Sequence, residues 1–212
     1  MTAATTSALS TTGVIADDVD HPGKPERLEL IAAVRELMLA AATAAPGADL
    51  TAATAGIRVL AGELGPSTGR IHRRPFQEVT RTLDGFRLGS LNPLGVPATV
   101  RVQRPGSVAA DLEPDALVEG PPDRMHGGAI AWLFDNVMGM ALQSLDLLCA
   151  TGTLTLRFVA PTPLGTALQM TADADPVQGR KVRVRAVLHD AAGTPTVHGE
   201  GLFILLREDE RL

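Results

Sequence analysis

Apolar residues recur at helical spacing in the first third of the chain. The pattern begins after Pro25, a residue suited to a first helical turn, and includes Leu28, Ile31, Val34, Leu37 and Met38. It predicts a helix that ends before Pro46-Gly47. A second, weaker helix is expected from about Asp49 to Leu64, before Gly65-Pro66.

Beyond Asn92 the apolar positions alternate with a period of two, as in half-buried β-strands. Thr99–Arg104 and Ser107–Leu112 flank Pro105-Gly106 and predict a hairpin. Three more alternating segments, at 153–158, 168–172 and 182–188, predict further strands, and the run from Thr196 to Leu206 completes an antiparallel meander.

Between these strand groups, the stretch from Gly127 to Leu142 carries only two polar side chains, Asp135 and Asn136. A helix that is apolar on nearly every side must be buried on nearly every side. We therefore expect an α+β fold in which a curved antiparallel β-sheet wraps around a central helix.

These patterns divide the chain into three parts. Residues 1–23 are rich in Ala, Thr and Ser and are expected to be disordered. Residues 24–90 form a helical extension and linker, and residues 91–212 form the main domain.

Composition narrows the class of protein. The 212 residues include 24 acidic and 19 basic side chains, so no chain-wide positive field exists to hold nucleic acid. One cysteine, Cys149, excludes an intrachain disulfide, and no apolar run reaches the ~18 residues that cross a bilayer. The first residues lack the features of a signal peptide. We expect a cytoplasmic protein without nucleic-acid or membrane partners.

Asp135 is the first candidate for chemistry, because an ionised carboxylate among apolar neighbours is costly unless it has partners. One interpretation is a structural Asp, hydrogen-bonded to the backbone or to Asn136. The other is a buried general base.

The start of the same helix favours the catalytic interpretation. Gly127 and Gly128 occupy its first turn, where unpaired N–H groups can stabilise an oxyanion. Gly127 and Asp135 are eight residues apart, or roughly 12 Å of helix. One chain therefore cannot easily bring both groups to the same carbonyl. Two antiparallel helices could, which predicts a homodimer with composite sites.

An ordered set of motifs between about residues 91 and 206 resembles the hotdog-fold acyl-CoA thioesterases, and most closely the PaaI-like branch of the 4-hydroxybenzoyl-CoA thioesterase superfamily. The motifs are residues 92–95 (Asn-Pro-Leu-Gly), 118–122 (Val-Glu-Gly-Pro-Pro), His126-Gly127-Gly128 with Asp135, Thr151, 157–165, 179–181 and 199–203. The resemblance implies a five- or six-stranded sheet around a long helix, a dimer that is often assembled further as a dimer of dimers, and hydrolysis of acyl-CoA without a cofactor.

The resemblance also assigns roles to individual residues. Asp135 matches the catalytic acid, acting as base for water or as direct nucleophile, and Thr151 matches the hydroxyl that positions the water. Gly127 and Gly128 match the oxyanion-binding turn, and His126 matches a histidine that orients that turn. Some relatives carry Asn or Gln six residues before the His, where this chain has Gly120. Backbone amides would then act alone on the thioester carbonyl.

A CoA thioester carries phosphates, so Arg or Lys is expected near the site. By the same resemblance, the CoA-contacting turn matches Gly179, Arg180 and Lys181. Further candidates for substrate binding on these and neighbouring strands are Arg157, Gln169, Val182 and Arg183. For Arg183 and Arg185 the alternative is that alternating arginines mark a solvated strand face. No histidine has metal-ligand spacing, so we expect no metal.

Two other functions stay open from the sequence. An acyl-CoA-sensing transcription regulator would use the N-terminal helices on DNA, although residues 1–90 hold nine basic and ten acidic side chains. A dehydratase or hydratase of the same fold would need a His and an acid acting as a pair on the substrate carbons, whereas here the His lies beside the glycines.

Overall fold

The computed structural model describes residues 24–65 and 93–207. The expected disordered N-terminus and most of the linker lie outside these residues. Helices α1 (Lys24–Ala42) and α2 (Leu50–Glu63) form the N-terminal extension, as the sequence pattern predicts. Asp49 caps α2 by accepting a 2.9 Å hydrogen bond from the Thr51 N–H.

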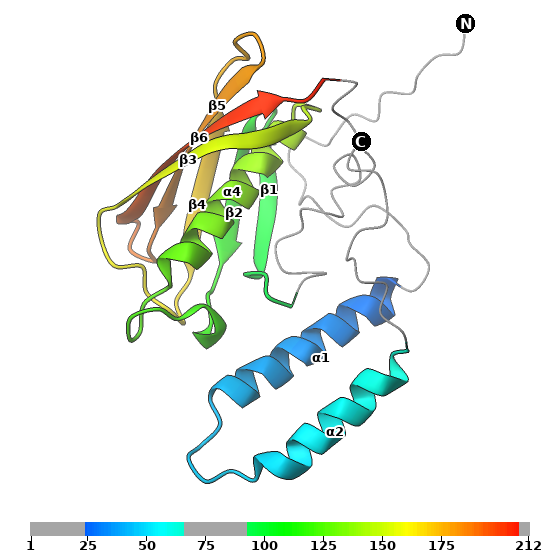
Figure 1. Cartoon of the computed structure of the whole chain (residues 1–212). Helices are drawn as coiled ribbons and strands as arrows, with labels where there is room; N and C mark the ends of the chain where they lie inside the picture. Colours follow the sequence, from blue (N-terminus) through cyan, green and yellow to red (C-terminus); the bar gives the residue numbers. More distant parts are fainter. Residues whose placement is uncertain (1–23, 66–92, 208–212) are drawn as a thin grey trace, which may run out of the picture.

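The remaining described residues form a curved six-stranded antiparallel sheet around one long helix (Figure 1). Its strands are β1 (Ala98–Arg104), β2 (Ser107–Leu112), β3 (Cys149–Phe158), β4 (Leu168–Ala174), β5 (Lys181–His189) and β6 (Pro195–Leu205). The helix is α4 (Gly127–Gln143), and a short 3₁₀ turn, η1 (Ala116–Val118), precedes it. This architecture confirms the predicted α+β fold.

The strand order, β1-β2-β4-β5-β6-β3, differs from a simple meander. Strands β4, β5 and β6 are consecutive neighbours, but β3 pairs with β6 and lies at the edge of the sheet. The connection after β3 therefore leads from one edge of the sheet back to β4 in its interior. Strand β4 pairs with β2 and so joins the β1–β2 hairpin to the β4–β5–β6 meander. Periodicity identified every strand but could not reveal this pairing.

One face of α4 fills the concave side of the sheet. Its fully buried side chains include Ile130, Leu133, Phe134, Val137 and Met138. Glycines on β6 permit the close approach: a Cβ added to Gly199 would lie 2.4 Å from Cδ1 of Phe134, and one added to Gly201 would lie 2.8 Å from Sδ of Met138. Larger residues at these two positions would push the helix off the sheet.

The opposite face of α4 is only half-buried, so the expectation of burial on nearly every side is wrong for a single chain. This face carries Ala131, Trp132, Asp135, Asn136, Gly139 and Gln143. A Cβ added to Gly139 would meet no atom within 4 Å. The sequence pattern indicates a helix that is apolar on nearly every side, but within this chain the sheet covers only one side of that helix.

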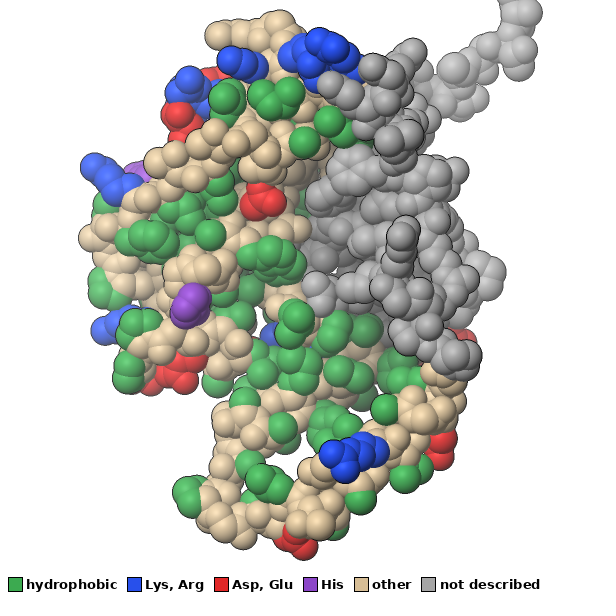
Figure 2. Space-filling view, in the orientation of Figure 1, with side chains coloured by type: hydrophobic (Ala, Val, Ile, Leu, Met, Phe, Trp, Pro, Cys, Tyr) green, Lys and Arg blue, Asp and Glu red, His purple; other side chains and the backbone are tan. Residues whose placement is uncertain are grey.

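Arg35 attaches α1 to the main domain. Its guanidinium donates to Asp115 (2.6 Å), to the carbonyl of Pro93 (2.9 Å) and to that of Gly95, and its side chain is only 12% exposed. The rest of the extension is more open, and Figure 2 shows apolar side chains gathered over α1 and α2. Those that are well exposed are Leu30, Leu37, Leu50, Ile57, Val59, Leu60 and Leu64. Neither of these two helices nor α4 is long and apolar enough to span a membrane.

Candidate active site

Asp135 and Thr151 are brought together from two elements. The Thr151 hydroxyl on β3 donates a 2.7 Å hydrogen bond to Oδ1 of Asp135 on α4. Asn136 does not bond this carboxylate; its amide instead donates to the Trp132 carbonyl one turn back (2.7 Å). The second oxygen of Asp135 is therefore the one available to a water molecule or an acyl group.

A bulge at Gly152 turns Thr151 toward the helix. Thr151 pairs with Phe203 and Thr153 with Leu202, so one extra residue lies in β3 between these two pairs. In an unbroken strand Thr151 would share the outer face with Thr153, because alternate residues point the same way. A Cβ added to Gly152 would lie 3.2 Å from both Ile204 Cγ1 and the Leu202 carbonyl oxygen, so the bulge is tightly confined.

Asp135 and Thr151 line a small pocket of about 40 Å³ between α4 and β3. Its remaining walls are largely apolar and consist of Gly139, Leu142, Gln143, Leu147, Leu148, Cys149 and Phe203. The carboxylate thus lines a small, mostly apolar recess. Such a recess suits an acyl group rather than a charged one.

Cys149 is a second nucleophile in the wall of this pocket, but its ionisation argues against a role in catalysis. Burial raises the pKa of the Cys149 thiol to about 11. At neutral pH the side chain is therefore a thiol, and the thiolate is the reactive form. Asp135 remains the better candidate.

His126 orders the loop that leads into α4. It is the N-cap residue, and its Nδ1 accepts a 2.9 Å hydrogen bond from the Gly128 N–H. This geometry agrees with an orienting role for the histidine. It also means that the Gly128 amide is already engaged, whereas the structure gives no acceptor for the Gly127 amide among the described residues.

The packing around Gly120 accounts for the absence of the Asn or Gln that some relatives carry six residues before the histidine. A Cβ at this position would lie 2.9 Å from the Cα of His126, closer than a real Cβ can come. The His126 N–H also donates to the Val118 carbonyl (2.8 Å), which holds the two segments together. An Asn or Gln at position 120 would displace His126, so this chain has no side-chain donor there.

The CoA-binding candidates at the β4–β5 turn lie together. Gly179 has a φ of +62°, and Arg180 donates to the Leu205 carbonyl through Nε (3.2 Å) and Nη2 (3.0 Å). Lys181 is exposed. Val182 departs from the expectation, because its side chain is fully buried in the core and points away from this surface.

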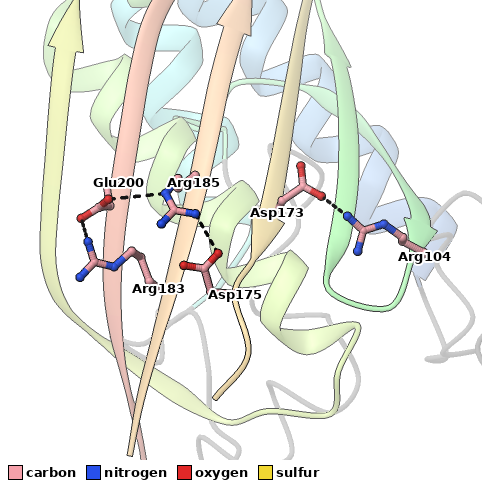
Figure 3. Close-up of polar contacts among 6 residues, drawn as sticks. All are labelled: Arg104, Asp173, Asp175, Arg183, Arg185 and Glu200. Atoms are coloured by element: carbon pink, nitrogen blue, oxygen red, sulfur yellow. Dashed lines mark hydrogen bonds and ion pairs between the residues drawn. The ribbon is translucent and has the colours of Figure 1, made fainter. Parts of the chain in front are cut away.

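The other basic candidates belong to ion pairs on the outer face of the sheet (Figure 3). Arg183 contacts Glu200 (2.5 Å), and Arg185 contacts Asp175 (2.8 Å) and Glu200 (3.7 Å). Arg104 and Asp173 form a separate pair (2.8 Å). This geometry favours the interpretation of Arg183 and Arg185 as a solvated strand face, since their charge already has acidic partners.

Gln169 and Arg157 are not brought to Asp135. Gln169 donates to Asp111 (3.1 Å) on the outer face, and this bond, with a further one from Arg101, holds the pKa of Asp111 below its usual value. Arg157 is exposed. In the β3–β6 register it lies opposite His198, so strand β6 stands between Arg157 and β5. Sequence reasoning placed both near the other candidates because strand order was unknown.

Two residues of the site were missed from the sequence. Gly152 creates the bulge, and a glycine inside an alternating strand was the available signal. Gln143 lines the pocket, but it is the last residue of α4, one position beyond the apolar stretch. No sequence pattern distinguishes it from an ordinary polar helix end.

The sheet, the central helix and the position of Asp135 together define a hotdog-fold domain. The thioesterase superfamily model matches residues 123–196, and a crystal structure of the thioesterase superfamily protein RHA08564 shares 26% identity and superposes with a TM-score of 0.74 over 84% of this chain and 94% of its own. The domain therefore has the hotdog fold, and its residues 123–196 are similar to the thioesterase superfamily.

Two curated relatives match part of this chain. They are the acyl-coenzyme A thioesterases THEM4 of Xenopus laevis (34% identical over 34% of this chain and 32% of the relative) and Rattus norvegicus (30% identical over 45% and 41%). The match thus spans less than half the length of these relatives. Since 84% of this chain superposes on RHA08564, that likeness reaches well beyond the segment matched by the superfamily model.

Proposed function

We propose that this protein is an acyl-CoA thioesterase that hydrolyses an acyl-CoA thioester to a free carboxylic acid and CoA. The observation that carries the proposal is the Asp135 carboxylate, held by the Thr151 hydroxyl at 2.7 Å beside a mostly apolar pocket. The similarity to acyl-coenzyme A thioesterases and to the thioesterase superfamily supports the same reaction.

In the first route Asp135 acts as general base. Its carboxylate takes a proton from a water molecule, the water oxygen attacks the thioester carbonyl, and the C–S bond breaks. The departing CoA thiolate recovers the proton from Asp135, so one water is consumed for each acid and thiol formed. Thr151 holds one carboxylate oxygen and thereby directs the other toward the water.

In the second route Asp135 attacks the carbonyl itself. The C–S bond breaks to release CoA and leaves a mixed anhydride on Asp135, which water then hydrolyses to restore the carboxylate. Both routes need an oxyanion site for the carbonyl oxygen. The backbone amides at Gly127 and Gly128 are the candidates. That of Gly127 has no acceptor among the described residues, whereas that of Gly128 donates to His126 Nδ1 and would have to exchange this bond for one to the carbonyl oxygen.

The oxyanion site for each Asp135 belongs to a second copy of the chain. The half-exposed face of α4 carries Ala131, and an antiparallel helix pair centred on that small residue would set Gly127 opposite Asp135. Strand β3 is an edge strand with unpaired backbone, and Phe158 at its end is 53% exposed. Both features support a homodimer with composite sites, and a dimer of dimers is a further proposed assembly.

The nucleotide end of CoA would lie near Gly179, Arg180 and Lys181. Lys181 is exposed, and the positive φ of Gly179 lets the backbone turn sharply beneath a phosphate. Three other candidates, Gln169, Arg157 and Arg183, receive less support. Gln169 and Arg183 already have polar partners on the outer face of the sheet. We also propose a cytoplasmic location, where reducing conditions keep Cys149 as a thiol.

A thiol-release assay tests this function directly. Purified full-length protein is mixed with acetyl-, medium-chain, long-chain and aromatic acyl-CoAs, and free CoA is detected with a thiol reagent. Turnover of at least one substrate, with no shift of random DNA on a gel, supports the thioesterase. Binding of acyl-CoA without turnover, together with a DNA shift, would favour a regulator, and turnover of enoyl-CoA without CoA release would favour a hydratase.

A further inference from the structure

One residue that lines the pocket beside Asp135, Gln143, has a side-chain oxygen without a partner among the described residues. Oε1 of Gln143 is buried from solvent, and no hydrogen bond reaches it from the described part of the chain. The other two polar side chains of the pocket, Asp135 and Thr151, bond each other. A buried amide group is normally hydrogen-bonded, because burial removes the water it would otherwise bind. Within one chain, the pocket therefore contains one unmet hydrogen-bonding position.

Gln143 lies at the far end of the pocket from the reacting group. It follows Asp135 by eight residues on α4, or roughly 12 Å of helix, and helical side chains point back toward the N-terminus, which shortens the gap. The wall between them is formed by Gly139, Leu142 and Leu147. An acyl group whose carbonyl lies at Asp135 would pass these apolar residues first and reach Gln143 with its distal end.

The volume limits the length of that acyl group. A pocket of about 40 Å³ has room for about three water-sized groups, at about 10–15 Å³ each. A long alkyl chain would have to leave it, whereas a chain only a few carbons longer than the carbonyl would place its last atom near Gln143.

We infer that Gln143 is a specificity residue that selects short acyl groups ending in a hydroxyl. A hydroxyl can both donate and accept, so it satisfies Gln143 whether the amide presents its oxygen or, after rotation about its last torsion, its NH₂. A methyl at the same place would leave the amide unpaired. This inference rests on the proposed thioesterase function and adds the class of acyl group.

The test compares pairs of substrates that exchange a terminal hydroxyl for a methyl: 5-hydroxypentanoyl-CoA with hexanoyl-CoA, and 6-hydroxyhexanoyl-CoA with heptanoyl-CoA. CoA release is measured with the full chain, and the enzyme-free rate is subtracted because hydroxyacyl thioesters can cyclise. We expect kcat/KM to be at least about tenfold higher for the hydroxyl member of one pair or both.

Gln143→Met keeps the length of the side chain but cannot form the hydrogen bond to the substrate hydroxyl. It should bring the ratio of kcat/KM between the hydroxyl and methyl substrates close to one. Gln103→Leu, on the exposed surface of β1, should leave it unchanged. Should Gln143→Met fail to fold, Gln143→Leu provides the second variant: it also lacks a hydrogen-bonding group, so the ratio should likewise fall close to one.

A wild-type ratio below about threefold in both pairs, or a ratio that the Gln143 variants leave intact, overturns the inference while leaving the thioesterase in place. Absence of CoA release from every acyl-CoA would instead overturn the proposed function, and the inference with it.

Discussion

Thr151 and Asp135 are joined by a 2.7 Å hydrogen bond that crosses from the edge strand to the central helix. The donor is a hydroxyl and the acceptor is one carboxylate oxygen, so the bond fixes the rotation of the carboxylate. Because the bulge at Gly152 is what turns Thr151 inward, three residues from two elements determine how the carboxylate is aimed.

Replacing Asp135 with Asn should leave the fold intact and lower kcat by about 10²-fold or more, the range for loss of a positioned acid or base. The amide is isosteric but can neither take a proton from water nor attack a carbonyl. The measurements are thiol release and a melting curve. Near-normal turnover in a well-folded variant would remove Asp135 from the reaction.

Thr151→Ala should cost less than Asp135→Asn, because Thr151 positions the carboxylate and does not itself act on the substrate. Thr151→Ser keeps the hydroxyl and should recover most of the rate. If the alanine variant loses as much activity as Asp135→Asn, or if serine does not rescue it, the two roles have been assigned wrongly.

The sequence predicted the elements of this site better than their arrangement. Period-two and helical patterns identified each strand and α4, because alternation and amphipathicity are local properties. Strand order is not local: nothing in the alternation of β3 indicates that it pairs with β6. For that reason Gln169 and Arg157 were grouped with residues that the sheet keeps apart.

The same limit applies to single residues. Asp135 was predictable, since a carboxylate in an apolar helix breaks the pattern, but its half-exposed position was not, because the uncovered side of α4 looks the same in sequence as a buried one. From the sequence, Gly120 was noted only because it lacks the polar side chain that some relatives carry at that position. The structure supplies its physical reason, which is the contact with the backbone of His126.

Gly152→Val should both destabilise the protein and reduce its activity. Even the first carbon of a side chain at Gly152 would press on Ile204 and on the Leu202 carbonyl, and such overpacking costs about 1–3 kcal/mol. Relief by straightening β3 would turn Thr151 away from Asp135. Urea unfolding and kcat measure the two effects, with Thr153→Val on the outer face as control. A destabilised variant with unchanged kcat would show that the bulge does not aim Thr151.

Lys181→Ala should raise KM for acyl-CoA more than KM for a truncated acyl-pantetheine thioester, because only the former carries the nucleotide phosphates. Arg180→Ala should act the same way, but it also removes the bonds to the Leu205 carbonyl, so its melting temperature must be recorded. Arg104→Ala, whose partner is Asp173, is the matched control and should change neither KM. Equal effects on both substrates would contradict a role at the nucleotide end.

The composite site can be tested with two inactive variants, Asp135→Ala and Gly127→Val. An added Cβ at Gly127 would lie 3.5 Å from Cζ of Phe158, an ordinary contact, so the fold should tolerate a side chain there while the backbone donor becomes blocked to substrate. If each site takes Gly127 from one copy and Asp135 from the other, a mixed dimer has one intact site and one doubly damaged site.

Random pairing makes about half of the dimers mixed, and each of these has one working site of two, so about a quarter of wild-type activity should return on co-expression. If both groups came from the same copy, every site would carry one lesion and no activity would return. Melting curves of each homodimer establish that both variants fold. With two folded partners and a mixed dimer isolated by two affinity tags, zero recovery would refute the shared site, because every other requirement for activity would then be met.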